Sequence, residues 1–210
     1  YASQFVPDLL ASYGLALPAA AHAQLAAQAA FVSPGAGGLV FLPYLNGERA
    51  PIWDTAARGV FFGISSQHRH RHFARAVLEG VAFSLRQILE VVEAASGQRV
   101  AQIVASGGPA AMPLWNEIKA SVLNRPVMIP QVIHAACLGA AMLAAVGAGW
   151  HADAAQAAGA MVYIAEQVAP DPQHAARYDT LYPLYTSLYP QLQRAYAQLA
   201  EFNQVETGRL

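Results

Sequence analysis

The sequence predicts an α/β fold, and three observations carry that prediction. Short apolar runs alternate with longer segments of helical periodicity through the middle of the chain, a pattern typical of helices on a sheet with some parallel pairing. Residues 101–123 read as an apolar strand, a glycine loop and a helix. Hydrophobic residues form 55% of the 210 residues and charged residues only 12%, so the chain can bury a sizeable core.

The charge balance argues against two classes of partner. The chain has 12 Lys and Arg residues against 13 Asp and Glu residues, a net charge of −1, so we expect no basic face for nucleic acid or acidic lipid. The apolar excess indicates instead that part of the surface meets another domain or subunit. The chain opens Tyr-Ala-Ser-Gln, without an initiator Met or a signal peptide, and this opening favours a fragment of a longer protein.

The most apolar stretch, Ala135 to Trp150, contains the single cysteine, Cys137. It is shorter than the ~20 residues that a bilayer span needs and is broken by glycines, so we expect a buried helix over Ala135–Val146. Cys137 is then predicted to be a buried, inert thiol. A lone cysteine forms no internal disulfide, so a reducing cytoplasm is the expected location.

The first 45 residues read as two helices, a turn and a strand. Helical spacing predicts helices over Gln4–Tyr13 and Ala19–Phe31. The turn cluster Ser33–Gly38 ends the second helix. The apolar run Leu39–Leu45 predicts a short strand, in which Pro43 is unsuited to a central ladder position.

The loop Asn46–Arg58 concentrates charge in a chain where charge is otherwise rare. Loops on a rigid scaffold often carry function, so its two carboxylates and two guanidiniums could bind or catalyse. They could equally satisfy one another and hold an irregular loop in place. Both interpretations stay open for Glu48, Arg49, Asp54 and Arg58.

A second strand is expected over Val60–Ile64 and is followed by three histidines, His68, His70 and His72. On an extended segment this spacing of two would place the rings on one face, as a metal site requires. Residues two apart on a helix do not face one another, and no carboxylate or thiol lies nearby. A solvated helix start is the preferred interpretation.

Phe73–Ala95 is the strongest predicted helix. Its apolar residues recur every three or four positions, and its charged residues mostly avoid that stripe. The stripe consists of Phe73, Val77, Val81, Leu85, Ile88 and Val92, and the charged set is Arg75, Glu79, Arg86, Glu90 and Glu93. Gly80 costs the helix about 1 kcal/mol relative to Ala, which indicates close packing at that point.

The segment from Ala101 to Leu123 is the one most suggestive of a binding site. The strand Ala101–Ala105 stops at Ser106-Gly107-Gly108, and a helix is expected over Pro113–Leu123. Two glycines at the end of a strand let a ligand approach the backbone, and free N–H groups are available at a helix start. A tight turn without a ligand would show the same residues.

The rest of the chain is predicted to be helical apart from one strand, Pro126–Ile129. From His151 onwards we expect helices joined by Pro-containing turns, with the tyrosines of Leu181–Tyr189 as packing groups. Gln191–Phe202 reads as an amphipathic helix, and 203–210 as a frayed tail.

Several ordered motifs together resemble the FGGY carbohydrate kinases. Residues 59–65 and 72–79 resemble the second signature of that family at every position. Phe41–Asp54 resembles the P-Y-L-x-G-E-R-x-P block of xylulokinases and gluconokinases. Ser106–Trp115 resembles the family's glycine-rich adenosine loop, and Leu138–Gly149 the helix that follows it.

The resemblance implies an actin-like, ribonuclease-H-like ATPase domain with a mixed sheet flanked by helices. Residues 1–210 would be the C-terminal, second domain of such a kinase, without its first strands. The cofactors implied are ATP and Mg²⁺, and the partners are the N-terminal domain of the same protein and a sugar, with a homodimer possible. The catalytic base and the phosphate-binding turns lie upstream in this family, so no catalytic residue and no metal ligand is expected in this chain, which would be inactive alone.

The resemblance also implies which residues meet the nucleotide. Gly107 and Gly108 would approach the adenosine, with Pro109 to Met112 beside them, and Gln4 would match a helix residue that reaches the nucleotide. The loop departs from the family pattern at three positions. Pro109 stands where a third glycine is common, Ala111 where a basic residue often lies, and Met112 where Ser or Asn usually caps the helix.

Three functions follow from the resemblance. A xylulokinase, making D-xylulose 5-phosphate, is favoured by residues 136–149 and by the tyrosine-rich stretch Tyr178–Tyr189. A gluconokinase is favoured by Gly47–Trp53 and by Phe61-Phe62-Gly63. A non-catalytic actin-like module that senses a nucleotide is favoured by the unusual loop at Pro109 to Met112.

Overall fold

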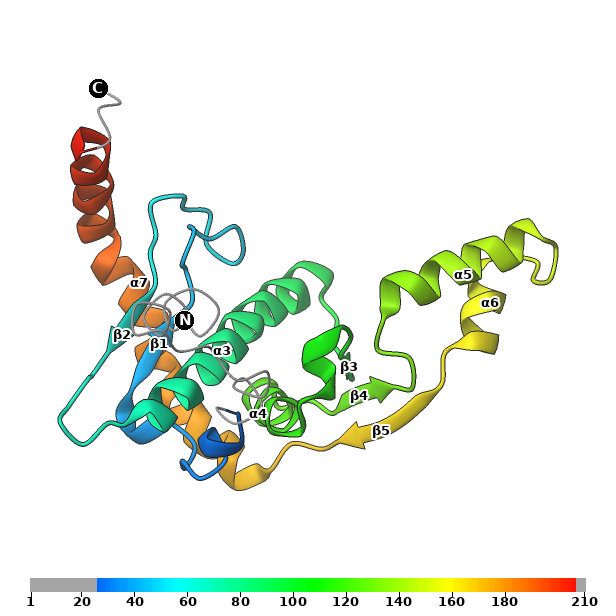
Figure 1. The fold of residues 1–210 in the computed structure, drawn as a ribbon, viewed down its shortest axis with the longest axis horizontal. Coiled ribbons are helices and arrows are strands. Elements are labelled where there is room, and N and C mark those ends of the chain that lie inside the picture. The colour runs from blue at the N-terminus through cyan, green and yellow to red at the C-terminus, as the bar shows by residue number, and fades with distance from the viewer. Residues whose placement is uncertain (1–25, 207–210) are drawn as a thin grey trace, which may run out of the picture.

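The computed structural model describes residues 26–206 (Figure 1). The helix expected over Gln4–Tyr13, with Gln4 itself, lies outside the described residues. So does most of the helix expected over Ala19–Phe31, of which residues 26–29 are described and are helical.

The strands form two small sheets. β1 (Val40–Leu42) and β2 (Val60–Phe62) pair antiparallel, in a register that places Val40 opposite Phe62. β3 (Ile103–Val104), β4 (Val127–Pro130) and β5 (Ile164–Val168) form the second sheet in the order β3-β4-β5. Because β3 is parallel to β4 and β4 is antiparallel to β5, this sheet is mixed, and the expected parallel pairing is confirmed.

Helices α3 (His70–Ser96) and α4 (Pro113–Leu123) join the two sheets. α3 packs on β1 on one side and on α4 on the other, and α4 also contacts β4, β5 and α7 (Figure 1). The main core lies where these helices meet β1 and α7, and two smaller clusters lie under the second sheet and between α3, β1 and the segment before β1. The buried residues of the main core are Val40, Leu42, Tyr44, Ala57, Ala82, Phe83, Ile118, Val122, Tyr178, Tyr182, Tyr185, Leu188 and Tyr196.

Gly80 lets α3 approach β1 closely, as its place in the helix predicts. A Cβ at this position would lie 2.2 Å from the carbonyl oxygen of Phe41. Gly97 then ends the helix in the left-handed conformation, and its N–H donates to the Glu93 carbonyl oxygen.

The buried face of α3 differs from the predicted apolar stripe. Leu85 and Val92 are exposed, whereas Arg75 and Glu79 are among the most buried residues of the helix. The two charges form an ion pair, with 2.7 Å between Arg75 Nε and Glu79 Oε1. Burial of charge is tolerated when it is paired and hydrogen-bonded, and hydrophobic spacing alone does not reveal such a pair.

From His151 onwards the chain forms one short helix, a strand and one long helix rather than a series of helices joined by Pro-containing turns. β5 pairs with β4, and α7 (Pro172–Glu206) runs continuously through Pro183 and Pro190. A proline inside a helix removes one hydrogen bond, and burial of five α7 side chains in the main core offsets this cost: Tyr178, Tyr182, Tyr185, Leu188 and Tyr196. Residues 203–206 are helical, so the frayed tail is wrong for them, and 207–210 lie outside the described residues.

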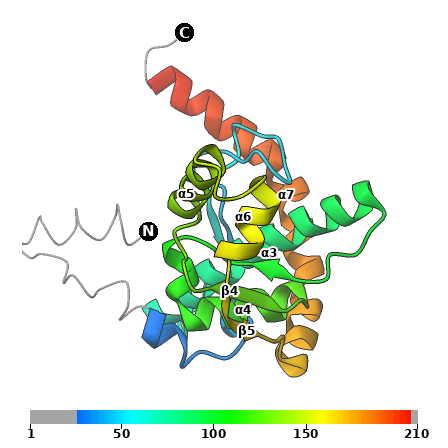
Figure 2. The ribbon, with the colours of Figure 1, turned by 90° about the vertical axis from the view of Figure 1, so that its right-hand side faces the viewer.

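The helix pair α5 (Ala135–Gly147) and α6 (Ala154–Met161) stands at one end of the molecule (Figures 1 and 2). The prediction that α5 is buried is wrong, since Ala145 is the only buried residue of the helix, and Cys137 is exposed. The reason is that α5 packs chiefly against α6 and not against the cores. No helix within residues 26–206 combines the length and apolar character needed to cross a bilayer.

Candidate functional site

The predicted strand, glycine loop and helix are present at residues 103–123. β3 ends at Val104, Gly107 adopts φ 80°, and a short 3₁₀ helix, η2 (Gly108–Ala111), leads into α4 at Pro113. Only glycine takes such a φ at no steric cost. The Gly107 N–H donates to the carbonyl oxygen of Ile133, 2.6 Å away, in the segment before α5.

Gly108 is not required by anything inside the described structure. Its φ is not positive, and a Cβ added there would meet no atom within 4 Å. The residue is exposed, and its N–H has no hydrogen-bond acceptor among residues 26–206. The loop therefore offers open space and a free backbone donor at its tip, the two features that a close ligand needs.

Asn116 connects this loop to α4. Its side-chain Nδ2 donates to the carbonyl oxygen of Ala110, 2.8 Å away, and the residue is buried. Its Oδ1 is buried without a hydrogen-bond partner. Neither Asn116 nor Ile133 was identified from the sequence. The position of the polar Asn116 on the buried side of α4 is a signal that could have identified it. Ile133 contributes only its backbone carbonyl, so its side chain gives no such signal.

The structure brings together five of the six predicted nucleotide-binding residues. Gly107, Gly108, Pro109, Ala111 and Met112 form one continuous loop between β3 and α4, while Gln4 lies outside the described residues. Met112 is the N-cap of α4 and makes no side-chain capping bond.

The charged loop 46–58 is held by its backbone, not by pairing among its charges. The Glu48 carboxylate accepts hydrogen bonds from the N–H groups of Arg49 and Ala50. Asp54 accepts one from the Ala56 N–H and one from the Tyr189 hydroxyl, at 2.8 Å. The interpretation that the four charged side chains pair with one another is therefore wrong for the described residues. The carboxylates instead stabilise a turn that the Tyr189 hydroxyl connects to α7.

The histidines lie at a helix start. α3 begins at His70, and the His68 and His72 rings meet edge to face, 5.4 Å apart. His68 Nε2 bonds with the Gly37 carbonyl oxygen, and His72 Nδ1 accepts from the Arg69 N–H. Within residues 26–206 no three His, Cys, Asp or Glu side chains are placed to hold a metal ion.

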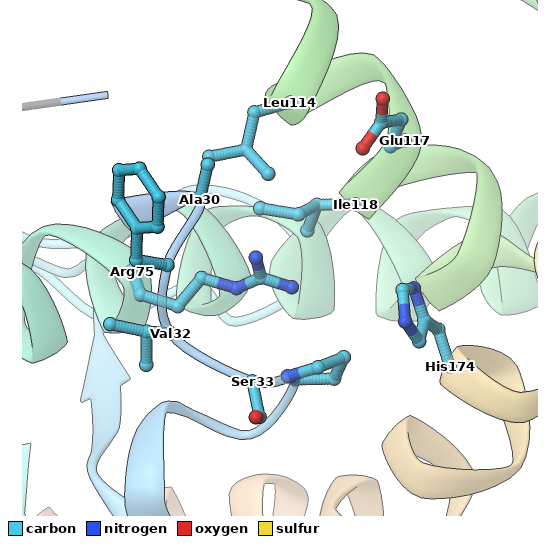
Figure 3. A pocket seen from close by; sticks show the side chains of 10 residues that line it. Ala30, Val32, Ser33, Arg75, Leu114, Glu117, Ile118 and His174 are labelled. Carbon is cyan, nitrogen blue, oxygen red and sulfur yellow. The ribbon is translucent and has the colours of Figure 1, made fainter. Parts of the chain in front are cut away.

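A cavity of about 310 Å³ opens between the segment before β1 and helices α3, α4 and α7 (Figure 3). The Arg75 side chain reaches into it, with Glu117 and His174 at its other side. The Tyr178 hydroxyl donates to Glu79 Oε1 and accepts from Arg75 Nη2. Burial raises the pKa of the Glu79 carboxyl, although Arg75 beside it acts in the opposite direction. This network ties α3 to α7, and its charges are already paired.

Comparisons with known proteins place the chain within one family. The model of the C-terminal domain of the FGGY family of carbohydrate kinases matches residues 8–148. The xylulose kinase of Lactococcus lactis is 37% identical over 173 residues, covering 82% of this chain and 34% of that protein. The gluconokinase of Bacillus licheniformis is 35% identical over 171 residues, covering 81% and 33%.

A solved structure agrees with these sequence relatives. The crystal structure of xylulose kinase from Rhodospirillum rubrum superimposes with a TM-score of 0.74 at 38% identity, over 93% of this chain and 38% of that one. The chain thus spans about a third of the length of the curated relatives it matches.

Proposed function

Because this chain belongs to the FGGY family of carbohydrate kinases, as a C-terminal domain of that family, we propose that it is the nucleotide-binding half of an ATP-dependent sugar kinase. The reaction transfers the γ-phosphoryl group of ATP to a sugar hydroxyl, with D-xylulose as the sugar. Phosphoryl transfer needs a base, a metal ion and groups that position the phosphates. This chain supplies the adenosine side of the cleft, and the preceding part of the kinase supplies the base and the groups that hold Mg²⁺.

The observation that carries the proposal is the open backbone at Gly108. A glycine that needs neither a special φ nor internal space is explained when a ligand occupies that space. The exposed N–H of Gly108 then has an acceptor, and the absence of a side chain allows a flat ring or a ribose to lie against the loop.

MgADP and MgATP binding, measured by calorimetry on this chain, tests the proposal. We expect saturable binding by the unchanged chain and at least tenfold weaker binding by Gly108→Val, whose added Cβ would meet no atom of the fold within 4 Å. Gly159→Val is the matched control, because Gly159 in α6 also has no neighbour within 4 Å of a built Cβ and lies outside the loop. Equal binding by Gly108→Val and the control would overturn the assignment of the loop.

The sugar is tested on the complete kinase that contains this domain. Release of ADP is compared with D-xylulose, D-gluconate and glycerol as acceptors, and we expect the highest kcat/KM with D-xylulose. D-gluconate is the second candidate, supported by relatives of nearly equal identity. The higher kcat/KM with D-gluconate would replace the xylulokinase assignment by gluconokinase.

A non-catalytic nucleotide-sensing module is the remaining candidate, and the loop at Pro109 to Met112 favours it. Met112 gives α4 no side-chain cap, and Ala111 offers no polar contact to a nucleotide. Nucleotide binding by the complete protein without turnover of any of the three acceptors would support this module over the kinase.

The exposed surface of α5 and α6 is a contact surface for the rest of the polypeptide in this proposal. Leu143 and Trp150 are exposed there. Exposed apolar surface of this kind marks an interaction site. Under the proposed function, the preceding part of the same kinase covers it.

A further inference from the structure

The glycine loop is held at two points, one on each side of its open tip. On the strand side, the Gly107 N–H donates to the Ile133 carbonyl oxygen at 2.6 Å. On the helix side, the Ala110 carbonyl oxygen accepts from Asn116 Nδ2 at 2.8 Å. Gly108 and Pro109 lie exposed between these two points.

The bond from Asn116 replaces one that the backbone lacks. In a 3₁₀ helix each carbonyl oxygen accepts from the N–H three residues further on. For Ala110 that residue is Pro113, which has no N–H. The Asn116 side chain, one turn into α4, supplies the missing donor to this buried part of the loop.

We propose that Asn116 is a positioning residue, which fixes the shape of the glycine loop so that its tip stays open to the nucleotide. This inference rests on the proposed function. The oxygen atom of the same side-chain amide indicates that Asn116 is present for its N–H donor and not for stability alone. Asn116 Oδ1 is buried without a partner, which is costly, and a leucine of similar size would remove that cost while losing the bond to Ala110.

Two measurements on this chain test the role of Asn116. Amide hydrogen exchange follows the loop through the N–H groups of Ala110 and Met112, which bond to Gly107 and Pro109. Calorimetry with MgADP follows nucleotide affinity. For Asn116→Leu we expect about tenfold faster exchange of both amides. We also expect about three- to tenfold weaker binding of MgADP, which corresponds to the free energy of one hydrogen bond.

Ser121→Ala is the matched control. Ser121 is buried on the same helix, and its hydroxyl accepts from the Asp171 N–H, away from the loop. We expect it to lower overall stability while leaving loop exchange and MgADP affinity unchanged. Equal effects of Asn116→Leu and Ser121→Ala on the loop, or no effect of Asn116→Leu, would overturn the proposal.

Asn116→Asp makes the donor to the Ala110 carbonyl oxygen depend on pH, and the proposal requires loop protection and MgADP affinity to follow that dependence together. A protonated carboxyl can donate to the Ala110 carbonyl oxygen, whereas an ionised one repels it. Relative to the unchanged chain at each pH, we expect loop protection and MgADP affinity to approach normal at acid pH and to fall at alkaline pH. A pH-independent defect contradicts the proposal.

The two proposals fail in distinguishable ways. If the unchanged chain and the complete kinase both fail to bind MgADP, the proposed function is wrong, and exchange of Ala110 and Met112 alone decides whether Asn116 holds the loop. If the unchanged chain binds MgADP and Asn116→Leu binds it equally well, the positioning role is wrong and the proposed function stands.

Discussion

Replacing Gly80 by alanine tests the closest helix–strand contact in the fold. The built Cβ lies 2.2 Å from the Phe41 carbonyl oxygen and 3.2 Å from the Phe41 Cβ, whereas ordinary contacts begin at 3.4 Å. α3 and β1 must therefore separate by about 1 Å, and because the contact is with backbone, this overpacking falls at the upper end of the usual range, about 3 kcal/mol. Alanine returns about 1 kcal/mol through its helix propensity. We expect a net loss of about 2 kcal/mol in the free energy of unfolding.

Urea denaturation measures this loss, and Gly139→Ala in α5 is the control. Gly139 is also inside a helix, but a Cβ there would meet no atom within 4 Å, so only the propensity gain of about 0.5–1 kcal/mol remains. With a urea m-value of about 2 kcal/mol/M, we expect the midpoint to fall by about 1 M for Gly80→Ala and to rise slightly for Gly139→Ala. A midpoint for Gly80→Ala at or above that of the unchanged chain would refute the reasoning from this contact.

Two further predictions concern the buried ion pair and the exposed thiol. Arg75→Met leaves Glu79 buried without a cation and is expected to cost about 3–5 kcal/mol of unfolding free energy near neutral pH. Burial raises the pKa of Glu79, so the folded state binds that proton more tightly than the unfolded state, and the cost should shrink as the pH falls; a cost that grows in acid contradicts this. Cys137 is exposed and should react with a thiol reagent without denaturant, and reaction only after unfolding would show that α5 is covered.

Local signals in the sequence predicted the loop and the helix ends well. Gly97 ends α3, Gly107 takes a positive φ and Pro113 begins α4, each for a backbone reason that acts within a few residues. The clash of a Cβ at Gly80 with β1 was likewise indicated by the cost of glycine in a helix. Such signals need no knowledge of what packs where.

Features that depend on distant partners were missed. Arg75 and Glu79 read as a charged outer face, but both bond to the Tyr178 hydroxyl, about a hundred positions along the chain. The role of Asn116 was missed for the same reason. The Ala110 carbonyl oxygen lacks a backbone donor because residue 113 is a proline, and the Asn116 side chain supplies one. Tertiary packing also carries α7 through its two prolines, against their local preference.

A glycine in α3 and a glycine in the exposed helix α5 differ in how closely a neighbour packs against them. Gly80 offsets its helix cost by close packing, whereas Gly139 gains nothing from residues 26–206. If the preceding part of the kinase covers α5, as we propose, Gly139→Ala should raise the midpoint of this chain but lower that of the complete kinase, where a close partner meets the new methyl group. Cys137 should then react more slowly in the complete kinase as well. A stabilising effect of Gly139→Ala in both proteins would mean that α5 accepts no close-packed partner at this point.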